Sequence, residues 1–320
     1  MGKQMRRSAE PHDNSAPVLI EHDLLVVGVP VFNEARYLEE TLRSLERQSW
    51  SDFAVLVADN ASNDGSELIA RQFCERDPRF HLHRHASNVG GLANFKFLRD
   101  STRSPLFMWL GGHDVLDPDF LSKTIAAHRA DPGITVAYSW MRMIGIDGST
   151  ECLLKNDVAA RMPGGPMRRY LHAYRYVYGY EINHLLRRSA FDDFDFRETL
   201  SWDLIFLAHL AFKGRFVCIQ KDLYSIRNVH PRDRESEQEV MERLTGAKGR
   251  KANIDATLGQ VEDDFASLAG GRLGWQLFRA MLKLVVLHRM RPNGAGWLSR
   301  LLHATAPIRT LFYEPFQKVR

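Results

Sequence analysis

Residues 24–34 read LLVVGVPVFNE, an apolar run that meets Pro30 and gives way to the polar pair Asn33 and Glu34. An apolar run without alternation is typical of a strand buried on both faces of a parallel sheet. Leucines at helical spacing follow in residues 34–48. The stretch therefore predicts the first strand and first helix of an α/β domain, joined by a polar loop.

The same unit recurs along the chain. A second apolar run at residues 53–58 stops at the polar turn 59–65, and a helix follows. Further strands are expected near residues 81–83, 106–110, 136–138, 216–219 and 223–226, and further helices near 92–100, 118–128 and 201–213. This alternation predicts a mostly parallel sheet, and ligands of such sheets bind beyond the carboxyl ends of the strands. The candidate loops are residues 30–34, 59–65 and 111–114.

The composition is that of a globular protein with a sizeable core, with 44% hydrophobic and 26% charged residues among 320. The three cysteines, Cys74, Cys152 and Cys218, are far apart and indicate reduced thiols in a cytoplasmic protein. Residues 1–22 have no apolar segment and are interpreted as a flexible leader. The sequence contains no apolar run of about eighteen residues, so no membrane span is predicted.

Positive charge collects at the carboxyl end. Residues 271–320 hold nine basic residues against the single acid Glu314, a net charge of +8, so the rest of the chain carries −4 of the total of +4. Because tryptophan and leucines accompany this charge, the segment either contacts an anionic membrane surface or packs back on the domain. No nucleic-acid-binding motif accompanies the charge, so nucleic acid is not an expected partner.

Five segments in a fixed order resemble the family 2 glycosyltransferases of GT-A fold. They are residues 28–34, 57–66, 88–91, 109–114 and 201–204. The resemblance covers about two thirds of the chain, and it is the order and spacing that make it specific. It implies a Rossmann-like GT-A domain over residues 23–230, with a mixed, mostly parallel sheet flanked by helices. Residues 231–320 are expected to form a helical, basic extension.

The resemblance also implies a nucleotide-sugar site. It places the nucleoside and diphosphate among Pro30, Phe32, Asn33, Glu34, Asp59, Asn60, Asn88, Gly90, Gly112 and His113. Asn60 stands where the family often has an Asp that binds uracil, and because an amide can both donate and accept, this position leaves the choice of base open. The donor expected from the resemblance is a UDP- or dTDP-sugar. The other interpretation of residues 59–66 is a simple turn and helix cap.

The family usually binds Mg²⁺ or Mn²⁺ through an Asp-x-Asp pair after the fourth strand. Here Gly111 and His113 replace the two aspartates, and Asp114 follows. His113 and Asp114 are the predicted ligands of Mn²⁺ or Mg²⁺, because imidazole suits transition metals. The alternative is that this pair contacts the diphosphate without a metal. His230 either contacts the metal or a phosphate, or is a surface histidine.

For the acceptor side, the resemblance points to one carboxylate. Asp203, retained where the family has its general base, is the expected base of an inverting reaction, and its alternative is a helix-start carboxylate. Trp202 beside it either faces a sugar ring or is buried. The basic and aromatic residues between Arg168 and Tyr178 either line an acceptor groove or form ordinary amphipathic packing.

The sequence thus predicts an inverting glycosyltransferase that acts on a glycan or lipid-linked acceptor in surface polysaccharide or glycolipid biosynthesis. It is expected in the cytoplasm, with peripheral contact to the inner membrane face. Two other hypotheses remain open. One is a non-catalytic nucleotide-sugar-binding or scaffold protein with a degenerate metal site; the weaker one is a nucleotidyltransferase.

Overall fold

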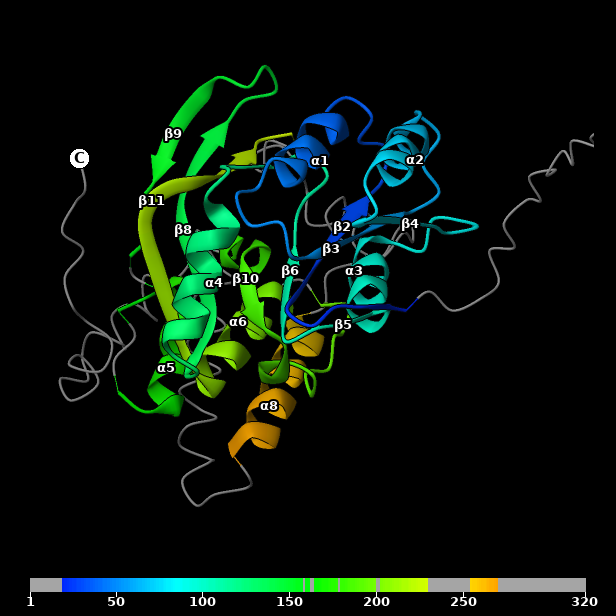
Figure 1. Ribbon diagram of the computed structural model, residues 1–320. Coiled ribbons are helices and arrows are strands. Elements are labelled where there is room, and N and C mark those ends of the chain that lie inside the picture. Colours follow the sequence, from blue (N-terminus) through cyan, green and yellow to red (C-terminus); the bar gives the residue numbers. More distant parts are fainter. Residues whose placement is uncertain are drawn as a thin grey trace, which may run out of the picture.

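The computed structural model describes residues 19–157, 159–161, 164–177, 179–199, 202–229 and 254–269 (Figure 1). Its centre is a nine-stranded sheet with the order β4-β3-β2-β6-β10-β8-β11-β7, in which β9 pairs with β8. Helices flank this sheet. The predicted α/β class, with a mixed and largely parallel sheet, is confirmed.

The first half of the sheet is parallel. Its strands are β2 (Leu25–Val31), β3 (Ala54–Asp59), β4 (Phe80–Arg84) and β6 (Leu106–Trp109). They are connected by α1 (Leu38–Glu46), α2 (Ser66–Arg76) and α3 (Gly91–Asp100). Because the strands run in one direction, the loops that follow them meet at one edge of the sheet.

The second half introduces antiparallel pairing. It contains β7 (Val115–Leu116), α4 (Phe120–Ala130), β8 (Ile134–Ile144), β9 (Thr150–Leu154), α5 (Pro166–Tyr176), η1 (Tyr180–Asn183), β10 (Leu185–Arg187), η2 (Arg188–Ala190), α6 (Trp202–Lys213), β11 (Arg215–Arg227) and α8 (Ile254–Ala269). Strand β10 is antiparallel to both β6 and β8 and so joins the two halves. Strand β11 runs parallel to β8, and the short β7 pairs with it.

Strand β11 differs from the prediction of two short strands. It is one strand with register shifts around Asp222, where the exposed polar residues 220–222 interrupt the apolar pattern. A bulge accommodates such residues without ending the pairing. The consequence is that β11 continues to Arg227 and reaches the edge where the loops gather.

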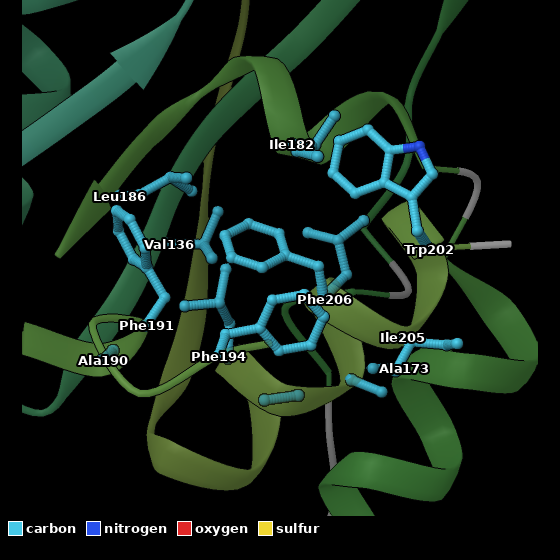
Figure 2. Packing of buried hydrophobic residues seen from close by; sticks show 14 of the residues in the cluster. Val136, Ala173, Ile182, Leu186, Ala190, Phe191, Phe194, Trp202, Ile205 and Phe206 are labelled. Carbon is cyan, nitrogen blue, oxygen red and sulfur yellow. The ribbon is translucent and has the colours of Figure 1, made fainter. Parts of the chain in front are cut away.

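Two apolar layers cover the two faces of the sheet, because side chains alternate along each strand. Val26 packs into a layer with α3, α5, α6 and α8, whereas Val27 packs into a layer with α1, α2 and α4. Figure 2 shows part of the first layer, in which Phe191, Phe194 and Phe206 lie together.

At the ends of the chain the structure adds two facts. Ile20–Glu21, within the expected leader, forms β1 and pairs with β5 (Thr102–Arg103). Of the expected extension, the structure describes α8, whose Val261 and Phe265 belong to the first apolar layer. The basic segment 271–320 and His230 lie outside the described residues. Among those described, no helix is long and apolar enough to cross a membrane.

Candidate functional site

The loop after β2 is fixed to the turn after β3. The backbone N–H of Asn33 donates to Ser62 Oγ at 2.9 Å, and that of Glu34 donates to Ser66 Oγ at 2.9 Å. Asn33 has a left-handed backbone (φ 56°), and its Oδ1 accepts the N–H of Asn63 at 3.0 Å. This left-handed residue lies between β2 and α1, and α1 begins at Leu38, the first of the leucines at helical spacing.

Phe32 projects from this loop with 46% of its surface exposed. The exposed ring offers a flat apolar surface on which a planar ligand could stack. Pro30, which was also predicted to contact the nucleotide, is half-buried within β2.

Asp59 and Asn60 are both buried and serve the loops around them. The Asp59 carboxylate is fully buried and accepts a 2.6 Å hydrogen bond from Arg84 Nη1. The Asn60 amide donates to Asn88 Oδ1 at 2.9 Å and accepts the N–H of Val89 at 2.8 Å. These two side chains therefore hold the turn and the loop at residues 88–90, where Asn88 also accepts the N–H of Gly90. Direct contact of Asp59 and Asn60 with a nucleoside stays a prediction.

The loop after β6 lies against the loop after β2. Nδ1 of His113 is 2.9 Å from Oε1 of Glu34, and since a carboxylate only accepts, Nδ1 carries the proton. On the other side, Thr41 Oγ1 in α1 donates to the carbonyl of Gly112 at 3.0 Å. His113 keeps 24% of its side chain exposed. The structure thus brings together Glu34, Gly112 and His113, as predicted from their places after parallel strands.

The charge of His113 is set by opposing effects. Burial disfavours the imidazolium, but the hydrogen bond to Glu34 and the negative charges of Asp114 and Glu34 outweigh it, so the pKa of His113 is raised. In the neutral form, the bond to Glu34 leaves Nε2 as the free ring nitrogen. This is how a carboxylate commonly orients a histidine that binds a metal.

Asp114 is almost completely buried and is held by β11. Its Oδ2 accepts the hydroxyl of Tyr224 at 2.7 Å, and its Oδ1 accepts the N–H of Arg227 at 2.9 Å. Burial raises the pKa of Asp114, although His113 and these two hydrogen bonds oppose that rise. The sequence reasoning missed Tyr224 and Arg227 as parts of the site.

The side chains at this site fit a metal ion only if the phosphate oxygens of a bound nucleotide and water complete its coordination. Among the residues that the structure describes, no group of three or more His, Cys, Asp or Glu side chains could hold a metal. His113 Nε2 and Asp114 Oδ1 lie 4.0 Å apart and could supply two ligands. Two protein ligands with the remainder from phosphate oxygens and water is a common arrangement for Mg²⁺.

The predicted base, Asp203, lies in the first turn of α6 and is half-buried. A Cβ at Gly179 would be 2.7 Å from Asp203 Oδ2, and Gly179 has a positive φ of 95°. Gly179 immediately precedes η1, and His184, which follows η1, packs its ring against that of Tyr224 with the ring centres 4.7 Å apart. The residue before η1 thus lies close to Asp203, and the residue after it lies against the strand that holds Asp114.

Of the alternatives left open on the acceptor side, burial describes Trp202, Tyr170 and Tyr174. Trp202 is 6% exposed (Figure 2), and it packs edge to face on Phe95. Tyr170 and Tyr174 are fully buried, and Arg169 donates to carbonyls at the end of α6. Of this segment, Met167 and Arg168 are exposed, and the side chains of 175, 176 and 178 lie outside the described part of the chain.

Comparison with known proteins identifies the relationship. The family described as "Glycosyl transferase family 2" matches residues 26–194. Among curated proteins, the chain is 22% identical over 167 residues to "Putative glycosyltransferase EpsH" of Bacillus subtilis, which is 51% of this chain and 47% of that protein. It is 26% identical over 131 residues to "Glycosyltransferase GlyA" of Streptococcus pneumoniae, 40% of this chain and 19% of that protein. The chain thus matches less than half the length of these relatives.

Solved structures share the fold. The Staphylococcus aureus protein TarS, residues 1–349 in complex with UDP, superposes with a TM-score of 0.59 at 14% identity, covering 88% of this chain and 75% of that one. The mannosyltransferase PcManGT of Pyrobaculum calidifontis, in complex with GDP-Man and Mn²⁺, gives a TM-score of 0.51 at 16% identity, covering 94% and 85%. These likenesses confirm the predicted GT-A fold.

Proposed function

This chain belongs to glycosyl transferase family 2, and from that membership we propose that it transfers a sugar from a nucleotide-diphosphate sugar to a hydroxyl acceptor with inversion. The observation that carries the proposal is the contact between Glu34 and His113, which joins the loops after β2 and β6 at the carboxyl edge of the parallel strands. Ligands of open α/β sheets bind at such an edge.

We assign the binding of the donor's nucleobase to the exposed ring of Phe32. This ring lies next to the network of Asn33, Asn60 and Asn88 that fixes the surrounding loops. Structures of similar fold are complexes with UDP, UDP-GlcNAc and GDP-Man, which supports a nucleotide-sugar donor. We assign a UDP- or dTDP-sugar to this chain, in keeping with the structures of similar fold that hold UDP and UDP-GlcNAc.

The diphosphate is assigned to the exposed face of His113, with a divalent cation, Mn²⁺ or Mg²⁺, held by His113 and Asp114. The PcManGT complex, which has a similar fold, contains Mn²⁺ together with GDP-Man, and this supports the assignment. When bound, such an ion neutralises the charge that develops on the leaving diphosphate. The residues of this chain orient the site, because Glu34 holds His113 and β11 holds Asp114.

Asp203 is assigned as the general base. Its place at the amino end of α6 stabilises the ionised carboxylate, which can then remove the proton from the attacking hydroxyl. Gly179 makes room for this carboxylate, and His184, at the other end of η1, packs against Tyr224. The acceptor is proposed to be a glycan or lipid-linked glycan of a surface polysaccharide or glycolipid. The basic segment 271–320 would hold the protein at the cytoplasmic membrane face.

The proposal is tested with Asp203→Asn. Purified wild-type protein is expected to be stabilised in a thermal-shift assay by a UDP-sugar with Mn²⁺ and to release UDP in the presence of acceptor. The variant should keep the thermal shift and lose transfer by about 10²- to 10⁴-fold. Asp119→Asn, at an exposed position before α4, is the matched control.

The rival hypothesis, a non-catalytic nucleotide-sugar-binding protein, has its own observation in its favour. The first metal-binding Asp of the family is Gly111 here, and Asp114 is already held by Tyr224 and Arg227. Stabilisation of the wild type by donor, without turnover on any acceptor, would favour this rival. Transfer that survives in Asp203→Asn would contradict the assignment of the base.

A further inference from the structure

Arg227 lies at the end of β11 and makes contacts that no assigned role explains. Its guanidinium donates from Nε to the carbonyl of His113 at 3.0 Å, from Nη1 to the carbonyl of Gly145 at 3.1 Å, and from Nη2 to Glu40 Oε2 at 2.6 Å. It also lies 4.7 Å from the centre of the Tyr37 ring. A single side chain therefore joins α1, the loop after β6 and the turn between β8 and β9.

The same residue holds Asp114 through its backbone. Its N–H donates to Asp114 Oδ1, while Tyr224, three residues earlier on the same strand, donates to Oδ2. The end of β11 thus fixes both the carbonyl of His113 and the carboxylate of Asp114. These are consecutive residues of the loop assigned to the diphosphate.

Burial decides what kind of role Arg227 can have. Only 4% of the residue is exposed, so its guanidinium is not available to a ligand. Its neighbour His113 is the exposed member of the loop, at 24% of its side chain. Arg227 acts on a donor through the atoms that it holds, which makes it a positioning residue.

We propose that Arg227 positions the His113–Asp114 segment for donor binding, an inference that rests on the proposed function. The planar guanidinium provides donors in three fixed directions, and these match the carbonyls of His113 and Gly145 and the carboxylate of Glu40. A lysine ammonium at the end of a flexible chain cannot reach all three at once. Arg227→Lys should therefore behave almost as badly as Arg227→Gln.

Arg187 is a matched control at the opposite edge of the sheet. Its Nε donates to the carbonyl of Ile134 at 2.8 Å and its Nη2 to the carbonyl of His128 at 3.1 Å, so it too joins segments through main-chain oxygens. It pairs with Leu106 at the amino end of β6, away from the proposed donor site. Arg187 is half-buried, and its variants report what the loss of an arginine with main-chain partners does to stability alone.

The experiment compares Arg227→Lys, Arg227→Gln, Arg187→Lys and Arg187→Gln with the wild type. For each protein, we would measure the melting temperature, the donor KM with UDP-GlcNAc or another UDP-sugar that the wild type turns over, the acceptor KM, and the Kd for UDP with Mn²⁺. Both Arg227 variants should raise donor KM and UDP Kd by about 10- to 100-fold, because small displacements of a binding loop have effects of this size. Acceptor KM should not change, and the Arg187 variants should lower only the melting temperature.

The results separate this inference from the function on which it rests. If the Arg227 and Arg187 variants lower the melting temperature alike and leave donor KM and UDP Kd unchanged, Arg227 is structural and the inference is overturned. Full rescue by Arg227→Lys would also overturn it. If the wild type binds no UDP, UDP-sugar or GDP-mannose, the proposed function fails and this inference fails with it.

Discussion

The imidazole of His113 and the carboxylate of Glu34 meet at 2.9 Å, although 79 residues separate them in the chain. One residue follows β2 and the other follows β6, and these strands are parallel neighbours. The pair therefore closes the gap between two loops at the edge where an α/β sheet binds its ligands. Its geometry leads to the first prediction.

Glu34→Gln should weaken the response to Mn²⁺ and lower transfer by about 10- to 100-fold, because the partner of a metal-binding histidine sets its orientation and basicity. The amide oxygen can still accept from Nδ1, so the fold should be retained. Turnover of the UDP-sugar measured against Mn²⁺ concentration is the readout. Glu39→Gln, which removes only an exposed ion pair with Arg43 on α1, is the control. An unchanged Mn²⁺ response would contradict the assigned role of Glu34.

Gly179→Ala should damage the site of the proposed base. The new Cβ would meet Asp203 Oδ2 at 2.7 Å, and the backbone at φ 95° disfavours any side chain. We expect a loss of about 1–3 kcal/mol of stability and a lower kcat with an unchanged donor Kd. Chemical denaturation and steady-state kinetics would measure these. Gly165→Ala is the control, because Gly165 has a φ of −76° and nothing lies near its Cβ. Equal behaviour of the two variants would count against the prediction.

Gly111→Asp, which recreates the first Asp of the family motif, should not restore a stronger metal site. A Cβ at Gly111 would lie 2.9 Å from Oδ2 of Asp114, which Tyr224 already holds. The added carboxylate also repels the buried one. We expect lower stability and lower turnover, with Gly111→Ala separating the steric part from the charge. Tighter Mn²⁺ binding by Gly111→Asp in calorimetry would show that the prediction is wrong.

Stability should fall on mild acidification because two histidines are buried in neutral form. Burial lowers the pKa of His128 to about 4 and that of His184 to about 3, whereas both titrate near 6.5 when unfolded. Below about pH 6.5 the unfolded chain binds more protons than the folded one. The contribution is therefore complete above pH 6.5 and is lost progressively toward pH 4, by about 1.4 kcal/mol per pH unit for each histidine.

Denaturant unfolding at several pH values between 7.5 and 5 tests this prediction. His184→Phe keeps an aromatic ring against Tyr224 and removes one titrating group. Its stability should depend less steeply on pH than that of the wild type, by about one proton. Parallel curves for the two proteins would mean that His184 is not a source of the acid sensitivity.

Local sequence patterns predicted the elements that precede the site. The apolar run at residues 24–29 and the turn at 59–65 are visible without knowledge of any partner, and parallel strands then bring their ends together. For this reason the proximity of Glu34 and His113 could be foreseen, and the structure confirms it. The assignments of the nucleotide site, the metal ligands and the general base stay predictions.

Long-range partners could not be predicted in this way. Tyr224 and Arg227 lie 110 and 113 residues after Asp114, and Glu40 is 187 residues from Arg227. The polar residues 220–222 also hid the continuity of β11, which alone brings Arg227 to the site. No local spacing signals such contacts.

Burial of polar residues was equally hard to foresee. Asp59 and Asn60 stand in a turn that is rich in Asp, Asn and Ser, a composition typical of an exposed loop. The structure buries both, because Arg84 pairs with Asp59 and the loop at residues 88–90 covers Asn60. Trp202 was left open between a sugar contact and the core, and it lies in the core.

The two apolar layers determine which parts of the candidate site a core substitution can reach. Substitutions that share no neighbours have independent, additive effects on stability. The first layer contains residues of α6, which carries Asp203, and of α3, which follows the loop at residues 88–90. The second layer contains the apolar residues on either side of Glu34 and His113, namely Val31, Leu38, Leu110 and Leu116. A substitution in the second layer should therefore disturb the contact between Glu34 and His113 while α6 and Asp203 keep their places.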